Sequence, residues 1–263
     1  MKYSLPIALI AISLVFSGCK KENGLINLFS INDDIRLGQQ VEDEIRGNPA
    51  EFPILNESTY ASSYAYVNRI LNDILNSGKV VYKNDFDWRI NIIDNDSVLN
   101  AFCAPGGYIC IYTGILKYLD AEDEFAGVLA HEIAHADRRH VTSQLTKIYG
   151  VSVLLAVVFG DNGGVLRDIA SGLASLTFSR SHETDADSWS VKYLCPTGID
   201  ARGAAGFFEK LLAMGASSPP AFLSTHPSPD NRVENINEQW TNECGTPGGT
   251  FDSRYADFKT TLP

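Results

Sequence analysis

Two histidines and a glutamate stand at a spacing that suits a zinc site. The run His131-Glu132-Ile133-Ala134-His135 has the form HExxH and lies in a segment with helical periodicity. Two imidazoles one helical turn apart project from the same face, so both can bind a single Zn²⁺. Glu132 lies beside that face, where it can take a proton from a water held by the metal. The run therefore predicts a metal-dependent hydrolase.

An alternative interpretation of HExxH is the polar face of a solvent-exposed helix. The residues that precede or interrupt the motif are small or apolar: Val128, Leu129, Ala130, Ile133 and Ala134. They indicate a largely buried helix, in which unpaired polar side chains would be costly. We therefore favour the metal site.

A third ligand is needed to complete such a site, and Glu183 is the candidate. It lies in the segment SRSHETDAD, residues 179–187. A carboxylate on a second helix would fill three of the four tetrahedral positions and leave the fourth for water. Asp187 would share the face of Glu183 and could accept a hydrogen bond from a ligating imidazole, which fixes its tautomer. The alternative is the acidic start of a solvated helix, which is weaker beside an HExxH run.

Two further histidines, His140 and His182, stand near these motifs but outside the ligand spacing. A lone histidine beside a site is usually not a ligand. We expect both at the surface or at helix ends.

Composition narrows the class of protein. The 263 residues are 44% hydrophobic, which is enough to bury one substantial core. Asp and Glu total 32 against 21 Lys and Arg, a net charge of −11, so no overall positive field attracts phosphate backbones and no nucleic-acid partner is expected. The body of the chain has no apolar run of about 20 residues, which argues against a channel or transporter.

Hydrophobic periodicity places the motifs on secondary structure. It predicts helices over residues 33–46, 57–76, 120–147 and 183–194, and strands over 86–92, 98–103 and 108–113. Asp120 is the expected N-cap of the long helix that carries HExxH. The fold class is therefore α+β: one helix-rich domain with a small antiparallel or mixed sheet.

The N-terminus has the pattern of an export signal. Lys2 precedes an almost wholly apolar run, and Ser17-Gly18 stands before Cys19. The segment FSGC is similar to the bacterial lipobox, although the usual Leu is replaced by Phe16, and it predicts lipidation of Cys19. An ordinary cleaved signal is the alternative. The expected organisation is a signal peptide (1–18), a tether (19–32), a zinc metallopeptidase domain (33–245) and a C-terminal tail (246–263).

Four other cysteines form an even set, which suits an oxidising compartment. Cys103 and Cys110 flank a Pro-Gly-Gly turn and would face each other across a hairpin, so we favour that disulfide and a second one between Cys195 and Cys244. The alternative is four separate buried thiols, because sequence does not fix distances.

Four motifs in order are similar to a known family. They are HEIAH, SRSHETDAD, Asn100-Ala101-Phe102 with PGGYI at 105–109, and Thr225-His226-Pro227 with Arg232. Together they resemble peptidase family M48, the HtpX-like and CAAX-prenyl-endopeptidase-like zinc metallopeptidases. The resemblance covers residues 33–240 and is closest to soluble periplasmic lipoprotein members linked to outer-membrane quality control.

The resemblance implies a gluzincin-type domain with His131, His135 and Glu183 as ligands of one Zn²⁺. It also implies that the segment Asn100, Ala101 and Phe102 is an edge strand on which an extended polypeptide pairs by main-chain hydrogen bonds. His226 and Arg232 are implied to lie near the metal, where they could donate to the oxyanion that forms on the scissile carbonyl. A capping turn, with Arg232 in a structural salt bridge, is the alternative.

The expected function is a zinc-dependent endopeptidase in which Glu132 activates the water on the zinc. Its expected substrates are misfolded or misassembled envelope proteins. The expected location is the periplasmic face of the bacterial envelope, anchored by lipid at Cys19; Lys20 after that cysteine favours the outer membrane. A rival function is an outer-membrane assembly factor or chaperone whose peptide groove matters more than its cleavage. A structural zinc protein would instead require four protein ligands, usually thiolates.

Overall fold

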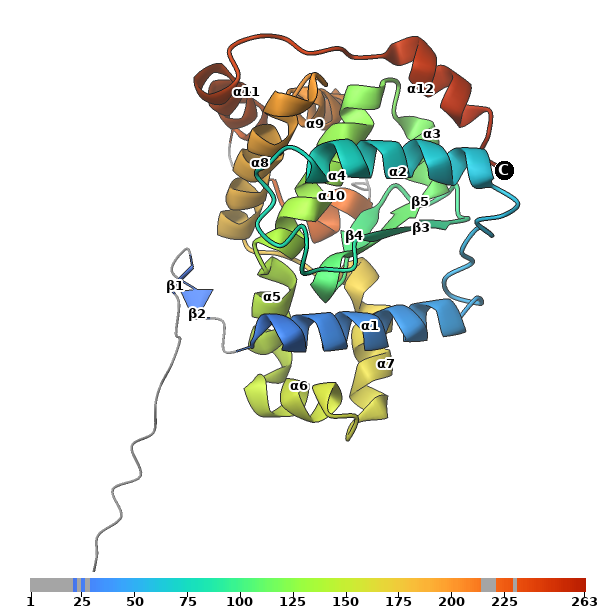
Figure 1. Ribbon diagram of the computed structural model, residues 1–263, viewed down its shortest axis with the longest axis vertical. Coiled ribbons are helices and arrows are strands. Elements are labelled where there is room, and N and C mark those ends of the chain that lie inside the picture. Colours follow the sequence, from blue (N-terminus) through green and yellow to red (C-terminus); the bar gives the residue numbers. More distant parts are fainter. Residues whose placement is uncertain (1–20, 23–24, 27–28, 214–220, 229–230) are drawn as a thin grey trace, which may run out of the picture.

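A small sheet and a long buried helix position the predicted motifs (Figure 1). The computed structural model describes residues 21–22, 25–26, 29–213, 221–228 and 231–263. Cys19 and the predicted signal peptide 1–18 lie outside the described residues, so the structure does not bear on either prediction.

The described elements follow the predicted order. The helices are α1 (Ile31–Gly47), α2 (Ala61–Leu75), α3 (Thr113–Tyr118), α4 (Glu122–Asp137), α5 (His140–Tyr149), α6 (Val151–Val158), α7 (Gly163–Gly172), α8 (Arg180–Leu194), α9 (Gly203–Ala213), α10 (Ala221–Thr225), α11 (Arg232–Glu243) and α12 (Asp252–Lys259). Short 3₁₀ turns are η1 (Pro105–Gly107), η2 (Leu173–Ser175) and η3 (Cys195–Thr197), and the strands are β1 (Lys21–Glu22), β2 (Leu25–Ile26), β3 (Arg89–Ile93), β4 (Ala101–Cys103) and β5 (Tyr108–Tyr112). The predicted α+β class is confirmed.

The three-stranded sheet is mixed, in the order β3-β5-β4. The pair β3 and β5 is parallel, and the pair β4 and β5 is antiparallel. Helices α2 and α4 lie on one side of the sheet and α1 on the other (Figure 1). The central strand β5 is buried along its whole length because helices cover both faces, which suits its sequence YICIY.

Helix α4 is buried along almost its whole length and packs against α8 and α9. Gly127 makes the contact with α9 possible, because a Cβ atom there would lie 2.3 Å from the main-chain nitrogen of Ala204. The backbone of α9 therefore leaves no room for a side chain at position 127, and it cannot move aside unless the whole of α9 shifts.

The prediction of one helix over residues 120–147 is wrong, because two helices, α4 and α5, occupy this segment. Arg139 adopts a left-handed conformation with φ of 59° between them. Its guanidinium is buried and binds Asp34 of α1 through Nε at 2.6 Å, and it also donates to the carbonyl oxygen of Phe29 at 2.6 Å. This buried ion pair offsets the cost of the unusual backbone conformation. The N-cap of α4 is Ala121 and not Asp120.

The C-terminal segment treated above as a tail packs against the domain. In α12, Tyr255 and Phe258 are buried, and the ring of Phe258 stacks on Tyr66 at 4.2 Å between centroids. Arg254 pairs with the buried carboxylate of Glu122 at the start of α4. Two apolar anchors and one ion pair are enough to hold so short a helix in place.

The cysteines correct one of the two predicted disulfides. Cys195 and Cys244 are joined, which ties the end of α8 to the end of α11. Cys103 and Cys110 are free and buried. The hairpin register pairs Cys103 with Ile109 and Phe102 with Cys110, so the two thiols are one position out of step and point to opposite faces of the sheet.

Among the residues that the structure describes, no single helix combines the length and the apolar character needed to cross a membrane. The helices α5 and α6 reach that length and composition only when taken together, and they are bent by 112° relative to each other.

Candidate metal centre

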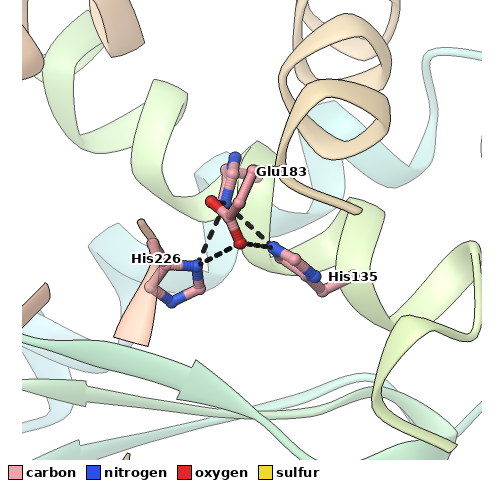
Figure 2. A group of neighbouring side chains, drawn as sticks. His135, Glu183 and His226 are labelled. Carbon is pink, nitrogen blue, oxygen red and sulfur yellow. Dashed lines mark hydrogen bonds and ion pairs between the residues drawn. The ribbon is translucent and has the colours of Figure 1, made fainter. Parts of the chain in front are cut away.

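Four side chains from three parts of the chain converge next to the sheet, and Figure 2 labels three of them: His135, Glu183 and His226. Helix α4 supplies His131 and His135, one turn apart on the same face, and α8 supplies Glu183. His226 follows α10 and approaches from the opposite side. Each of the four offers one donor atom, all four donor atoms lie within 4.8 Å of one another, and all four residues are buried.

The two histidines of HExxH turn the same ring nitrogen toward the centre of this group. Nε2 of His131 lies 3.0 Å from Nε2 of His135. The carboxylate of Glu183 spans both, at 3.3 Å from each Nε2 atom. Two helices thus bring together three side chains that could hold a metal ion.

Asp187 fixes the tautomer of His131. Its Nδ1 lies 2.9 Å from Oδ1 of Asp187, so Nδ1–H donates to this carboxylate and Nε2 keeps its lone pair for the centre. Asp187 was expected in this supporting role on the basis of its spacing from Glu183.

This donor set fits a divalent cation. Burial lowers the pKa of His131, but hydrogen bonds to Asp187 and Glu183 raise it more, to about 9. The buried centre therefore attracts positive charge, which a bound metal ion would supply in place of the proton. Two imidazoles and a carboxylate are the ligands of a catalytic zinc site.

The resemblance implied that His226 lies near the metal, and the structure places it among the ligand atoms themselves. Its Nδ1 is 3.2 Å from Oε1 of Glu183 and 3.3 Å from Nε2 of His131. Main-chain hydrogen bonds hold its segment in place, from Phe222 to Leu99 and from Phe178 to Thr225. No local pattern in the sequence fixes this approach, because it depends on how α10 binds the segment that precedes β4.

The comparisons with known proteins agree with this geometry. The model of peptidase family M48 matches residues 61–240. The chain belongs to peptidase family M48. The family that the motifs predicted is thereby confirmed.

Three relatives of this M48 chain carry names that describe proteases. It is 34% identical to mitochondrial metalloendopeptidase OMA1 of Arabidopsis thaliana, over 55% of this chain and 30% of that protein. It is 32% identical to mitochondrial metalloendopeptidase OMA1 of Schizosaccharomyces pombe, over 86% of this chain and 66% of that protein. It is 29% identical to the beta-barrel assembly-enhancing protease of Escherichia coli K12, over 78% of this chain and 43% of that protein. The chain thus spans between about a third and two thirds of the length of these relatives.

Glu132 of this M48 site is buried beside the ligand group. Burial raises its pKa, and the nearby His226 and His131 offset only part of that rise. Nε2 of His226 lies 3.4 Å from Oε1 of Glu132. A carboxylate with a raised pKa is suited to accept a proton and release it again during one reaction cycle.

Arg232 begins α11 and reaches the same group from the side of Asp187. Its Nη2 lies 2.7 Å from Oδ1 of Asp187 and 3.1 Å from Oε2 of Glu183. The guanidinium also rests on the ring of Phe208, 3.7 Å from its centroid. Arg232 therefore offsets the charge of two buried carboxylates, and its guanidinium lies beside the ligand group.

The predicted substrate strand is at the edge of the described sheet. Ala101 and Phe102 belong to β4, and Asn100 immediately precedes it. In this structure other parts of the chain already contact that edge: Asn100 Nδ2 donates to the carbonyl oxygen of Ala174 at 3.0 Å, and Phe222 binds the carbonyl oxygen of Leu99.

Sequence reasoning missed two residues near the site. His140 and His182 lie in the first turns of α5 and α8, as one of the two expectations had it, but both are buried, with exposed fractions of 1% and 2%. Cys103 lies near Glu132. Burial first, and then the charge of the Glu132 carboxylate, raise the pKa of the Cys103 thiol well above its usual value. Helical spacing did not predict the position of His140, because the left-handed Arg139 between α4 and α5 interrupts the helix.

Proposed function

We propose that this chain is a zinc-dependent endopeptidase that hydrolyses peptide bonds by using Glu132 as its base. One observation carries the proposal: His131, His135 and Glu183 turn their donor atoms to a common point with Glu132 beside it. Membership of family M48 and the names of the relatives support the same reaction.

The residues of the chain divide the work of hydrolysis. His131, His135 and Glu183 would hold Zn²⁺, which when bound supplies the positive charge that polarises the scissile carbonyl and the attacking water. Glu132 accepts a proton from that water and passes it to the leaving amine. We assign His226 and Arg232 as donors to the oxyanion.

His226 must change place for this reaction to occur. In the described arrangement its imidazole lies within the ligand group, in contact with His131 and Glu183. We infer that this is the arrangement without substrate, and that His226 moves off the ligand group when a peptide enters. Its imidazole N–H is then free to donate to the carbonyl oxygen.

An extended polypeptide would bind along β4 by main-chain hydrogen bonds. We propose that this polypeptide is a misfolded or misassembled envelope protein. The E. coli relative named for beta-barrel assembly supports this proposal. A second candidate function, assembly factor or chaperone with secondary proteolysis, has the same support.

Metal content and cleavage of casein test the enzyme. We expect one zinc per chain and hydrolysis by the wild type. Glu132→Gln should keep the metal and lose activity by several orders of magnitude, whereas His131→Ala and Glu183→Ala should lose the metal. Full activity of Glu132→Gln would exclude the mechanism. Restoration of envelope assembly in cells by Glu132→Gln would favour the assembly function.

The location is a separate proposal. We propose that lipid on Cys19 anchors the chain to the periplasmic face of the envelope, with Lys20 favouring the outer membrane. Cys19→Ser should release the protein from membranes in a fractionation experiment. Mass spectrometry that finds an unmodified N-terminal peptide after membrane purification would contradict lipidation.

A further inference from the structure

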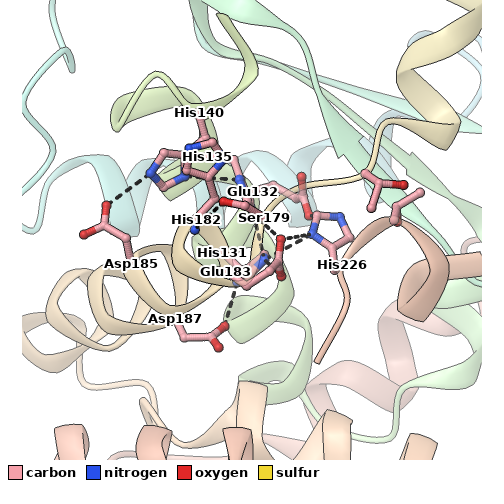
Figure 3. Close-up of polar contacts among 12 residues, drawn as sticks. His131, Glu132, His135, His140, Ser179, His182, Glu183, Asp185, Asp187 and His226 are labelled. Atoms are coloured by element: carbon pink, nitrogen blue, oxygen red, sulfur yellow. Dashed lines mark hydrogen bonds and ion pairs between the residues drawn. The ribbon is translucent and has the colours of Figure 1, made fainter. Parts of the chain in front are cut away.

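A chain of polar contacts runs from His135 through the buried His140 to the partly exposed Asp185 (Figure 3). Nε2 of His135 faces the ligand group, and Nδ1 on the other side of the ring lies 3.2 Å from Nδ1 of His140. Nε2 of His140 in turn lies 3.2 Å from Oδ2 of Asp185. The mechanism proposed above uses neither His140 nor Asp185.

The contacts permit one arrangement of protons when His135 binds a metal through Nε2. Nε2 must then carry a lone pair, so the proton of the neutral ring is on Nδ1 and is donated to His140. His140 accepts through Nδ1, which puts its own proton on Nε2, where it is donated to Asp185. Each imidazole thus fixes the tautomer of the next.

His131 and His135 are supported in different ways. His131 donates directly to the carboxylate of Asp187, which Arg232 also binds. His135 reaches a carboxylate only through a second imidazole. A histidine ligand usually donates its other N–H to a carboxylate, a carbonyl or a water, so His140 takes a place in which another imidazole is unusual.

The fold builds this contact through the break between α4 and α5. In one continuous helix, residues five positions apart would point about 140° away from each other. The left-handed Arg139 turns the chain and brings His140 back against His135. The buried ion pair between Arg139 and Asp34 fixes this turn.

Packing fixes the ring of His140 as well. It stacks on the ring of His182, with centroids 4.5 Å apart and planes at 14°. Asp185 is held by Arg138, whose Nε lies 3.3 Å from Oδ2. Packing and hydrogen bonds from the chain itself therefore set both the ring orientation of His140 and the position of its acceptor.

We propose that His140 is a positioning residue of the metal centre, which together with Asp185 fixes the tautomer and orientation of His135 and so raises the affinity for zinc. This inference rests on the proposed zinc site. It concerns how the chain holds the metal, and its test uses metal affinity and not peptide cleavage.

The experiment compares three variants of the full-length chain with the wild type. The Zn²⁺ dissociation constant is measured by competition with a chelator of known affinity. His140→Phe keeps the ring and its stacking but removes the acceptor, and we expect affinity to fall about 10- to 100-fold. His140→Asn can place an amide oxygen near the position of Nδ1, so it should recover most of that loss. His182→Phe keeps the stack and leaves the chain of contacts intact, so its affinity should equal that of the wild type.

A fourth variant guards against a folding defect. The side chain of Asp185 is 27% exposed, so Asp185→Ala should fold even if His140→Phe does not, and it should still weaken zinc binding. Wild-type affinity in a folded His140→Phe or in Asp185→Ala would overturn the inference. Equal losses in His182→Phe and His140→Phe would also overturn it, because packing alone would then explain them. Failure of the wild type to bind zinc would instead refute the proposed function.

Discussion

Nδ1 of His226 lies 3.2 Å from Oε1 of Glu183, a residue 43 positions earlier in the chain. The contact places His226 within the group of donor atoms, and its Nε2 lies 3.4 Å from Oε1 of Glu132. An imidazole in this place can either block the centre or, once displaced, donate to the reacting oxygen. The cleavage rate of a variant without this imidazole, His226→Ala, separates these two roles.

We expect His226→Ala to keep zinc bound by the three remaining ligands and to lower kcat. Loss of one donor to an oxyanion costs about 100-fold or more in kcat, with a much smaller effect on KM. Steady-state cleavage of a peptide, with metal content measured on the same sample, checks this. Faster cleavage than the wild type would show that His226 only obstructs the site.

Gly127→Ala should destabilise the fold by separating α4 from α9. The new methyl group would lie against the backbone of Ala204, which is a form of overpacking that costs about 1 to 3 kcal/mol. Gly172→Ala is the matched control, because nothing lies within 4 Å of a Cβ atom there. Urea unfolding of both variants gives the comparison, and equal stability of the two would contradict the close approach.

Removal of the disulfide should loosen the contact between α8 and α11. The bridge closes a loop of 49 residues, for which chain entropy predicts a loss of about 4 kcal/mol in the free energy of unfolding. The double variant Cys195→Ala, Cys244→Ala should melt at a lower temperature than the oxidised wild type and be unaffected by a reducing agent.

A thiol count checks the pairing itself. Cys103 and Cys110 should react with a thiol reagent when the oxidised chain is unfolded, and Cys195 and Cys244 should react only after reduction. Protection of Cys103 in the unfolded, unreduced chain would contradict the assignment of free thiols.

Asp123 should make the fold less stable as pH rises. Burial, with the charges of Glu124 and Asp200, raises its pKa from 3.8 to about 7. The folded chain therefore holds this proton where the unfolded chain has released it, and the associated stability is present below pH 4 and lost between about pH 4 and 7.

Asp123→Asn tests this by removing the charge. We expect the variant to gain about 2 kcal/mol in the free energy of unfolding at pH 8, and less at pH 5. Urea unfolding at the two pH values measures it, with Asp43→Asn on the exposed face of α1 as the control. A gain that is the same at both pH values would exclude titration of Asp123 as the cause.

The candidate metal ligands are predictable from the sequence because their spacing matches the period of a helix. His131 and His135 stand one turn apart, as do Glu183 and Asp187, so each pair shares a face wherever its helix lies. Hydrophobic periodicity also predicted helices and strands around these pairs. These features depend only on neighbours along the chain.

Contacts between distant segments could not be predicted in this way. The one-position offset that separates Cys103 from Cys110 depends on the register of β4 against β5, which the turn alone did not reveal. The burial of His140 depends on a left-handed Arg139, which is stabilised by Asp34, 105 residues earlier in the chain.

Local periodicity thus determined which side chains share a face, and with that the candidate ligands and the supporting carboxylate, while four motifs in order indicated the family. Only the tertiary structure decided that His226 enters the ligand group and that His140 lies behind His135. The physical reason is that both contacts depend on packing and hydrogen bonds between helices far apart in sequence, whose free energy no single segment contains.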